Sequence, residues 1–215
     1  DKNAGYHTTQ FYTVAISRHS GDRRVMGGTQ DNGTLYFQWD GAHAAEADKP
    51  MGGDGGYCYF GQNYAYVSSQ NGATYRIGYS GLTPSSGAGW TTITPRGSSG
   101  QLFINPFTVD PNNENIMYYP AGRYLWRNNA LSSIPLYQDS TNVGWTRLAD
   151  MAVAEGFTIS ALAVSRENPA NVLYFGASST NQKPKLYRLP DANTATLRCS
   201  GMPVRIMPPA TGSAS

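Results

Sequence analysis

The stretch FTVDPNNENIMYYPAGRYLWR, from Phe107 to Arg127, decides the fold of this 215-residue chain. Alternating apolar residues at Phe107 and Val109 lead into a polar turn rich in Asn, and an almost wholly apolar segment follows from Ile116 to Tyr119. A break of small residues then leads into a segment that ends in an aromatic residue and Arg127. Period-two alternation bounded by Asn, Pro and Gly is typical of short antiparallel strands. The stretch therefore predicts three strands joined by tight turns.

The same pattern occurs three more times along the chain. The clearest second copy is LAVSRENPANVLYFGASSTNQKPKLYR, from Leu162 to Arg188, and two weaker copies span residues 11–37 and 57–80. Equivalent positions in the four copies are Ala15, Tyr59, Val109 and Val164. The steps between them are roughly 44, 50 and 55 residues, the interval of four-stranded propeller blades. The repeat therefore predicts an all-β fold, a β-propeller of about four blades made of four antiparallel strands each.

The repeat also sets the expected domain organisation, which is a single propeller segment over residues 1–215. The expected blades are residues 8–50, 51–100, 101–150 and 151–198. Residues 199–215 are rich in Pro and small residues, and they are expected to connect to a further blade. An incomplete ring of blades leaves unpaired strand edges and uncovered faces. We therefore expect further blades or domains of the same protein, or a partner chain, to close the propeller.

Composition excludes several function classes. The net charge is +2 and charged residues make up only 14% of the chain, with no basic run of the kind that follows nucleic acid. No apolar stretch approaches the roughly 20 residues that a membrane-spanning helix needs. The chain begins at Asp1 without an apolar leader, so we expect the sequence to begin inside a longer protein. Many turn residues (Gly 24, Pro 13) and Tyr 15 fit an all-β protein with a polar, weakly charged surface.

Four segments resemble the BNR or Asp-box β-propellers of the sortilin and xyloglucanase-like superfamily. They are GGTQDNGT (27–34), GGDGGY (52–57), VDPNNENIMYY (109–119) and ISALAVS (159–165). The segment SSQNGATY (68–75) resembles a degenerate Asp-box, Ser-x-Asp-x-Gly-x-Thr-Trp, with Gln70 for Asp and Tyr75 for Trp, and DSTNVGWTRL (139–148) is a poorer remnant. The resemblance implies a module of a large secreted or cell-surface bacterial protein, of the kind found in Bacteroidetes. It also implies that the Asp-box is a structural turn.

Two Gly-flanked turns carry the candidate ligand-binding residues. In TQDNGT, Asn32 and Gly33 tolerate the positive φ of a type I′ hairpin turn, and Asp31 can close an Asx-turn. The functional alternative is that Gln30, Asp31 and Asn32 lie at the rim of the central channel and bind a polar ligand such as a sugar. In GGDGGY, Asp54 is either part of a tight turn between blades or an inward-facing acid or Ca²⁺ ligand.

Four tryptophans are candidates for a recognition surface: Trp39, Trp90, Trp126 and Trp145. Tryptophan buries a large area and keeps one polar atom, which suits both sugar stacking and protein contact. Packing between blades is the simpler role, because Trp126 and Tyr187 occupy matching positions of two repeats. Among the four, we take Trp90 as a candidate ligand-binding residue.

No metal or other cofactor is expected. His7, His19 and His43 are isolated, and the two cysteines do not form a CxxC pair. A Ca²⁺ site is conceivable on one turn, where the oxygen-bearing side chains are Asp110, Asn112, Asn113 and Glu114. The sequence leaves open whether Cys58 and Cys199 form a disulfide or remain two thiols.

These observations predict an extracellular or cell-surface module for recognition or assembly, binding protein or carbohydrate. The alternative is a glycoside hydrolase of the xyloglucanase-like type, which would need two carboxylates facing one glycosidic bond. Asp31 and Asp54 are the pair to test for that role, since each lies in a Gly-flanked turn. Oligomeric state and ligand identity stay open at this stage.

Overall fold

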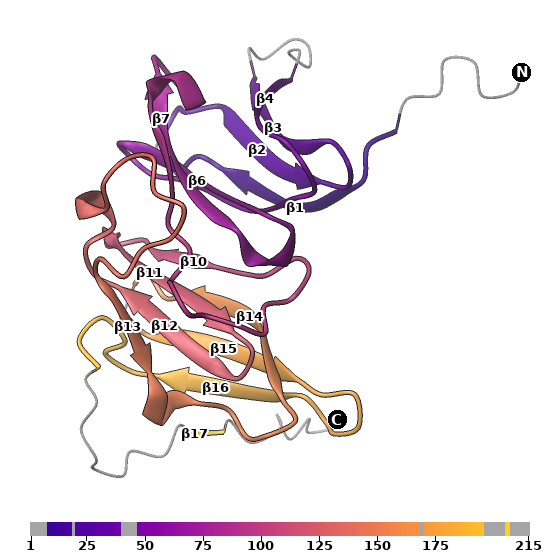
Figure 1. Ribbon diagram of the computed structural model, residues 1–215, viewed down its shortest axis with the longest axis vertical. Helices are drawn as coiled ribbons and strands as arrows, with labels where there is room; N and C mark the ends of the chain where they lie inside the picture. The colour runs from indigo at the N-terminus through magenta and orange to yellow at the C-terminus, as the bar shows by residue number, and fades with distance from the viewer. Residues whose placement is uncertain (1–7, 19, 40–46, 168–169, 196–204, 207–215) are drawn as a thin grey trace, which may run out of the picture. The chain divides into compact units, whose positions relative to one another are not determined.

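The protein is a β-propeller built of four antiparallel sheets, as a computed structural model shows (Figure 1). The structure describes residues 8–18, 20–39, 47–167, 170–195 and 205–206. The three histidines and Cys199 lie outside these residues. The helices in the described ranges are four single 3₁₀ turns: η1 (Gln70–Gly72), η2 (Ser86–Ala88), η3 (Leu131–Ser133) and η4 (Ala149–Met151). The predicted all-β fold is therefore confirmed.

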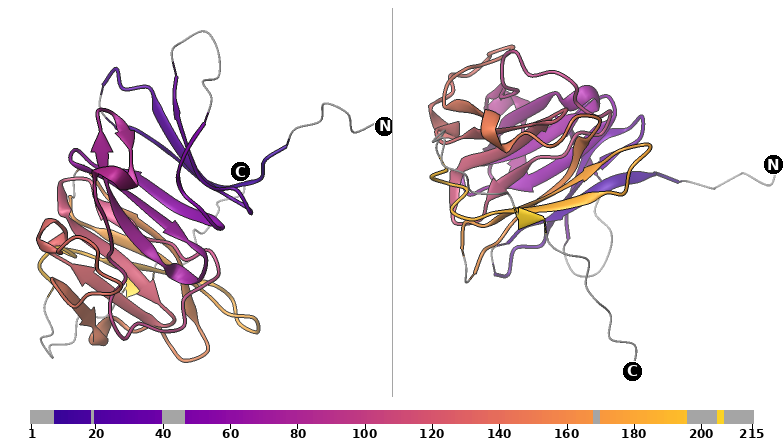
Figure 2. Two further views of the ribbon diagram at one scale, coloured as in Figure 1. Left: turned by 45° about the horizontal axis from the view of Figure 1, so that its top comes forward. Right: turned by 90° about the horizontal axis from the view of Figure 1, so that it is seen from below.

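Each sheet arranges its strands in chain order, as two further views show (Figure 2). Sheet 1 contains β1 (Phe11–Ile16), β2 (Arg24–Thr29), β3 (Gly33–Gln38) and β4 (Asp48–Met51). Sheet 2 contains β5 (Gly55–Phe60), β6 (Tyr64–Ser69), β7 (Thr74–Ser80) and β8 (Thr83–Pro84), and β9 (Trp90–Thr92) also pairs with β7. Sheet 3 contains β10 (Thr108–Asp110), β11 (Asn113–Ala121), β12 (Tyr124–Asn128) and β13 (Trp145–Leu148). Sheet 4 contains β14 (Thr158–Val164), β15 (Leu173–Ser178), β16 (Lys185–Leu189) and β17 (Arg205–Ile206).

The chain divides into two compact units. Unit 1 holds sheets 1 and 2 together with two short segments from later in the chain, Leu102–Asn105 and Ile134–Thr141. Unit 2 holds sheets 3 and 4 together with Gly97–Gln101. The strand β17 lies within 199–215, the stretch for which the sequence predicted a connector.

The core of unit 1 lies between its two sheets. Its buried apolar side chains are Met26 and Tyr36 from sheet 1 and Phe60, Ala65, Val67 and Ile77 from sheet 2. The rings of Tyr36 and Phe60 meet edge to face with their centroids 6.2 Å apart. Alternation along each strand places these residues on one side of the sheet and the intervening ones on the other.

A buried ion pair borders this core. The guanidinium of Arg24 donates from Nε to both carboxylate oxygens of Asp22, at 2.9 and 2.8 Å, and from Nη2 to Oδ2 at 2.5 Å. The same guanidinium lies over the rings of Phe60 and Tyr79, 5.2 Å from each centroid. Ser17 also donates its hydroxyl to the Asp22 carboxylate. The hydrogen bonds from Arg24 lower the pKa of Asp22 from 3.8 to about 2.

Glycine allows the two sheets of unit 1 to approach closely. A Cβ on Gly28 would lie 2.0 Å from the carbonyl oxygen of Gly56, and a Cβ on Gly55 would lie 2.2 Å from the carbonyl oxygen of Gly33. Real Cβ atoms do not approach oxygen this closely, so side chains at these positions would push the backbones apart. Gly28 of GGTQDNGT and Gly55 of GGDGGY therefore have a packing role between neighbouring blades.

The β2–β3 hairpin corrects one prediction. Thr29 pairs with Gly33, so the loop consists of residues 30–32 rather than of Asn32 and Gly33. Positive φ occurs at Asp31 (58°) and Gly33 (75°), so Asn32 is not a left-handed residue. The type I′ turn expected at Asn32 and Gly33 is therefore wrong, although the hairpin itself is where the sequence predicts it. Asp has a short polar side chain that tolerates the left-handed region, so the same sequence accommodates the longer loop.

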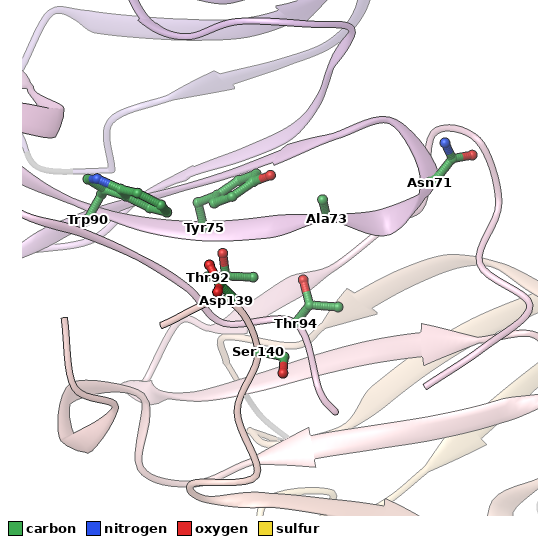
Figure 3. A pocket seen from close by; sticks show the side chains of 8 residues that line it. All are labelled: Asn71, Ala73, Tyr75, Trp90, Thr92, Thr94, Asp139 and Ser140. Carbon is green, nitrogen blue, oxygen red and sulfur yellow. The ribbon is translucent and has the colours of Figure 1, made fainter. Parts of the chain in front are cut away.

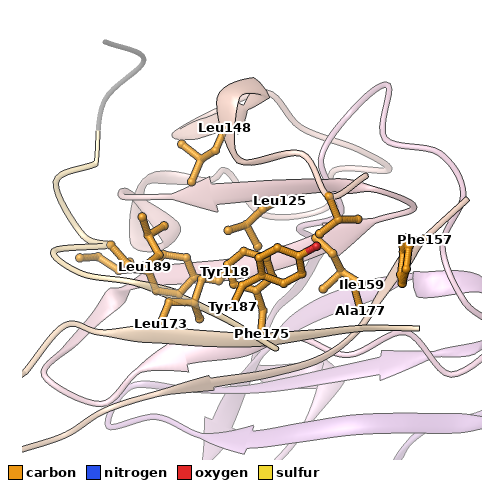
Figure 4. Close-up of a cluster of buried hydrophobic side chains, with 13 residues drawn as sticks. Tyr118, Leu125, Leu148, Phe157, Ile159, Leu173, Phe175, Ala177, Tyr187 and Leu189 are labelled. Atoms are coloured by element: carbon orange, nitrogen blue, oxygen red, sulfur yellow. The ribbon is translucent and has the colours of Figure 1, made fainter. Parts of the chain in front are cut away.

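The core of unit 2 lies between sheets 3 and 4 (Figure 4). Tyr118 and Leu125 from sheet 3 pack against side chains that include Ile159, Phe175 and Tyr187 from sheet 4. The rings of Phe175 and Tyr187 are stacked, with an interplanar angle of 9° and centroids 5.0 Å apart. All of these residues except Ile159 come from the two clearest copies of the sequence repeat.

Candidate functional site

A pocket of about 470 Å³ opens on unit 1. The residues that line it are Asn71, Ala73, Tyr75, Trp90, Thr92, Thr94, Asp139 and Ser140. Figure 3 shows the rings of Tyr75 and Trp90 beside one another, with Asn71 at the opposite end of the pocket from Trp90. The pocket thus combines an aromatic surface with hydroxyl, carboxylate and amide groups.

The pairing of β7 with β9 positions the aromatic surface. Tyr75 pairs with Thr92, and Ile77 pairs with Trp90, so all four side chains lie on the same face of the sheet. Ile77 is fully buried in the core of unit 1, and Tyr75 and Trp90 pack against that core while remaining partly exposed. Their rings meet edge to face with centroids 6.3 Å apart. Core packing therefore holds both rings in place and leaves part of each open to a ligand.

A distant segment, Ile134–Thr141, forms the opposite wall. Its backbone is held against β9, because the N–H of Tyr137 donates to the carbonyl of Trp90 at 2.9 Å. The N–H of Thr92 donates to the carbonyl of Gln138 at 2.9 Å, and the N–H of Gln138 donates to Oγ1 of Thr91 at 3.0 Å. This pairing brings Asp139 and Ser140 to the pocket.

The end of the pocket near Asn71 is a turn with left-handed backbone. Asn71 has φ of 59°, and its N–H donates to the carbonyl of Phe103 at 2.8 Å. Asn tolerates this conformation better than most residues. Nearby, Oγ1 of Thr94 accepts a hydrogen bond from the N–H of Thr74 at 2.9 Å. The turn therefore presents the Asn71 amide from a fixed backbone.

The two predicted acids come together at a different place. The N–H of Asp31 donates to Oδ1 of Asp54 at 2.9 Å, and the N–H of Asp54 donates to Oε1 of Gln70 at 3.1 Å. Asp54 thus links the β2–β3 loop to the turn η1 between β6 and β7. The pKa of Tyr12 is raised, first by burial and then by the negative charges of Asp54 and Asp31. The phenol of Tyr12 therefore lies in the electric field of both acids.

The structure separates the predicted site residues into two groups. Trp90 lines the pocket, whereas Gln30, Asp31, Asn32 and Asp54 are not among its lining residues. Gln30, Asp31 and Asn32 are exposed on the β2–β3 loop, and the Nδ2 of Asn32 donates to the carbonyl of Gln30 at 3.3 Å. The carboxylate that bonds the backbone of this loop belongs to Asp54.

The other tryptophans differ in burial. Trp39 is 46% exposed, so it does not pack in a core. Trp126 and Trp145 are partly buried, and the ring of Trp145 meets that of Tyr119 edge to face with centroids 6.0 Å apart. Tyr187, which matches Trp126 in the repeat, is buried in the unit 2 core. The simpler packing role therefore holds for Tyr187 and in part for Trp126 and Trp145, but not for Trp39.

The turn considered for Ca²⁺ is closed by its own hydrogen bonds. Oδ1 of Asp110 accepts from the N–H of Asn112 at 2.9 Å, and Oδ1 of Asn113 accepts from the N–H of Asn115 at 3.0 Å. In the described part of the chain, no three or more His, Cys, Asp or Glu side chains are grouped to hold a metal ion. These contacts give the turn a structural role.

Sequence reasoning missed most of the pocket, namely Asn71, Ala73, Tyr75, Thr92, Thr94, Asp139 and Ser140. Two signals were present: SSQNGATY supplies Asn71, Ala73 and Tyr75, and DSTNVGWTRL supplies Asp139 and Ser140. Both segments resemble Asp-box remnants, which implies turns rather than a site. Their meeting in space could not be read from either segment alone.

Within the residues that the structure describes, no helix is long and apolar enough to cross a membrane. Comparison with known proteins gives no relative: no protein-family model matches the chain, and no curated protein matches it either.

Proposed function

We propose that this chain is an extracellular or cell-surface propeller module, of the BNR or Asp-box type, that recognises a polar ligand, with carbohydrate as the favoured class. The observation that carries the proposal is the pocket of unit 1. Two partly exposed aromatic rings, Tyr75 and Trp90, lie beside the hydroxyls of Thr92, Thr94 and Ser140. Sugars present an apolar C–H face and a polar hydroxyl rim, so an aromatic surface edged with hydrogen-bonding groups suits them.

The polar groups of the pocket support recognition more than hydrolysis. Among the eight lining residues, Asp139 is the only acid, and glycoside hydrolysis needs two carboxylates flanking the bond. The carboxylate of Asp139, the amide of Asn71 and the hydroxyls can each bond a sugar hydroxyl. A single carboxylate among neutral donors and acceptors is sufficient for orientation and specificity.

Glycoside hydrolysis is the second candidate, and one observation favours it. Asp31 and Asp54 come from different blades and meet on unit 1, where the Asp54 carboxylate accepts the N–H of Asp31. If these two acids cleave a polysaccharide, Asp54→Asn removes turnover. A binding module keeps its ligand after the same change, because Asp54 does not line the pocket.

The test is a binding screen of the full chain against soluble plant and bacterial polysaccharides, followed by titration calorimetry of any that bind. Asn71→Ala and Asp139→Ala are the first variants, because both residues are exposed and line the pocket. Each lost hydrogen bond should weaken binding by about 1 to 3 kcal/mol, or roughly 5- to 150-fold. Trp90→Ala should abolish binding, and its thermal unfolding must be measured in parallel because Trp90 also packs against the core.

The matched control is Asp150→Ala, an exposed acid of unit 2 that does not line the pocket. Its affinity should equal that of the wild type. If Asn71→Ala and Asp139→Ala bind as the wild type does, the pocket is not the recognition site. Release of reducing sugar by the wild type, and its loss in Asp54→Asn, would instead support the hydrolase.

A further inference from the structure

Sheet 1 has an apolar face that no other sheet of unit 1 covers. Its members are Phe11, Val14, Ile16, Val25, Leu35 and Phe37. The strand register defines this face, since Ile16 pairs with Val25, and Val25 pairs with Phe37. Alternation places Met26 and Tyr36 on the opposite side, in the core against sheet 2. We call these six residues the exposed face of sheet 1.

The six side chains of this face carry no charge, and those on β1 are open to solvent. Val14 is 60% exposed and Ile16 is 69% exposed, and both lie on β1, the edge strand of the sheet. A Cβ on Gly27 would lie 2.5 Å from the Phe11 ring, so the aromatic ring covers the glycine on this side of the sheet. Neighbouring apolar side chains left in water on one sheet face are typical of an interaction surface.

Sheet 4 also has a face that sheet 3 does not cover, and its shape is different. Its members are Ala161, Ala163, Tyr174, Gly176, Leu186 and Arg188. Ala161 pairs with Gly176, and Gly176 pairs with Leu186, which is 45% exposed. The Cβ positions of Ala161 and Gly176 lie on the same side, 3.6 Å apart. We call this the exposed face of sheet 4; half of its residues are Ala or Gly, so bulky side chains can approach its backbone.

Each unit already shows how such faces combine. In unit 1, the face of sheet 1 that points toward the next sheet packs on sheet 2, and in unit 2 the corresponding face of sheet 3 packs on sheet 4. The exposed face of sheet 4 is the side that would receive a following sheet. The exposed face of sheet 1 is the side that would rest on a preceding sheet. The two faces are therefore the two halves of the same kind of blade-on-blade contact.

We propose that the exposed face of sheet 1 docks on the exposed face of sheet 4 of a second copy of this chain. The bulky side chains of sheet 1 meet the small residues of sheet 4, which continues the contact that each unit makes internally. Because each copy contributes two different faces, the contact is head to tail and repeats from copy to copy. This inference goes beyond the proposed function and does not depend on ligand binding in the pocket.

The experiment is light scattering coupled to size-exclusion chromatography on the full chain over a range of concentrations. The wild type should show masses that are multiples of 23.3 kDa and that rise with concentration. Ile16→Glu blocks one face and Leu186→Glu blocks the other, so each variant alone should be a monomer. Each retains one working face, so an equimolar mixture of the two should form a dimer of one copy of each and nothing larger.

Leu82→Glu is the matched control, since Leu82 is 54% exposed in unit 1 and belongs to neither face. It should associate as the wild type does. Circular dichroism checks that each variant folds, and Val14→Glu replaces Ile16→Glu if that variant does not. A wild type that stays at 23.3 kDa at every concentration overturns the proposal. A Leu186→Glu variant that still forms dimers overturns it too, because sheet 1 would then pair with itself. Ligand binding by these variants reports on the pocket separately.

Discussion

Asp22→Asn removes the negative charge from the buried ion pair of unit 1 and leaves Arg24 in place. In the wild type, the side chains of Asp22 and Arg24 are 14% and 8% exposed, so water screens the pair only weakly. The variant keeps the bond from Nη1 of Arg24 to the carbonyl of Leu82, at 3.1 Å, and its position over two aromatic rings. It loses the charge that compensates the guanidinium, and a buried charge without its partner is strongly destabilising.

The pKa of Asp22 sets the size of the expected loss in the free energy of unfolding. A carboxyl whose pKa falls from 3.8 in the unfolded chain to about 2 in the folded protein contributes about 2 kcal/mol of stability at neutral pH. Because the folded pKa is the lower one, this contribution is complete above the unfolded pKa and is lost as the pH falls toward 2. At pH 3, about 1 kcal/mol of it should already be gone. The variant should therefore be less stable by about 2 to 4 kcal/mol at pH 7.

The assay is urea unfolding followed by tryptophan fluorescence, at pH 7 and pH 3, for the wild type and Asp22→Asn. The difference between the two proteins should shrink by about 1 kcal/mol from pH 7 to pH 3. Subtracting the variant removes the titration of all other groups. Asp150→Asn, an exposed change in unit 2, should stay within about 0.5 kcal/mol of the wild type. If the difference in free energy of unfolding between the wild type and Asp22→Asn is the same at both pH values, the ion pair does not stabilise the fold as described.

Two further predictions concern unit 1. Gly28→Ala should destabilise the protein by about 1 to 3 kcal/mol in thermal unfolding, because its Cβ would lie 2.0 Å from a carbonyl oxygen, whereas Gly52→Ala has nothing within 4 Å and should be nearly neutral. Equal melting temperatures for the two variants would contradict the close packing. Burial raises the pKa of the Cys58 thiol to about 12, so in a Cys199→Ser background its alkylation at pH 8 should be at least about 100-fold slower in the folded protein than in urea. A folded-state rate close to the unfolded one would contradict that burial.

Much of the fold could be predicted from the sequence, because the repeat is clearest in the segments that form the buried core of unit 2. The apolar run Ile116 to Tyr119 lies in β11, and the matching run Val172 to Phe175 leads into and lies in β15. Both contribute buried residues to the unit 2 core. The last strands of the sheets were harder to predict. For example, β8 and β17 have only two residues each, too few to show alternation.

The candidate site could be predicted only in part. Trp90 stood out as an aromatic residue, but its neighbours in the pocket come from segments separated by up to about 70 residues in the sequence. No local pattern indicates that Asp139 meets β9. The turn type of the β2–β3 loop was predicted wrongly for a different reason. The dipeptide Asn-Gly favours a two-residue turn locally, but the observed register pairs Thr29 with Gly33 and leaves a three-residue loop.

The segment Ile134–Thr141 has a consequence for how the protein is made. It belongs to unit 1, although it lies between β12 and β13 of unit 2 in the sequence. A buried contact depends on it, since Nη2 of Arg76 donates to the carbonyl of Ile134 at 2.6 Å. Unit 1 therefore cannot be completed on the ribosome when residue 96 emerges; it must wait until residue 141 has left the exit tunnel. A gene cut after Arg96 would encode two sheets without one wall of their pocket. The first half of the chain therefore needs a segment of the second half to complete its fold.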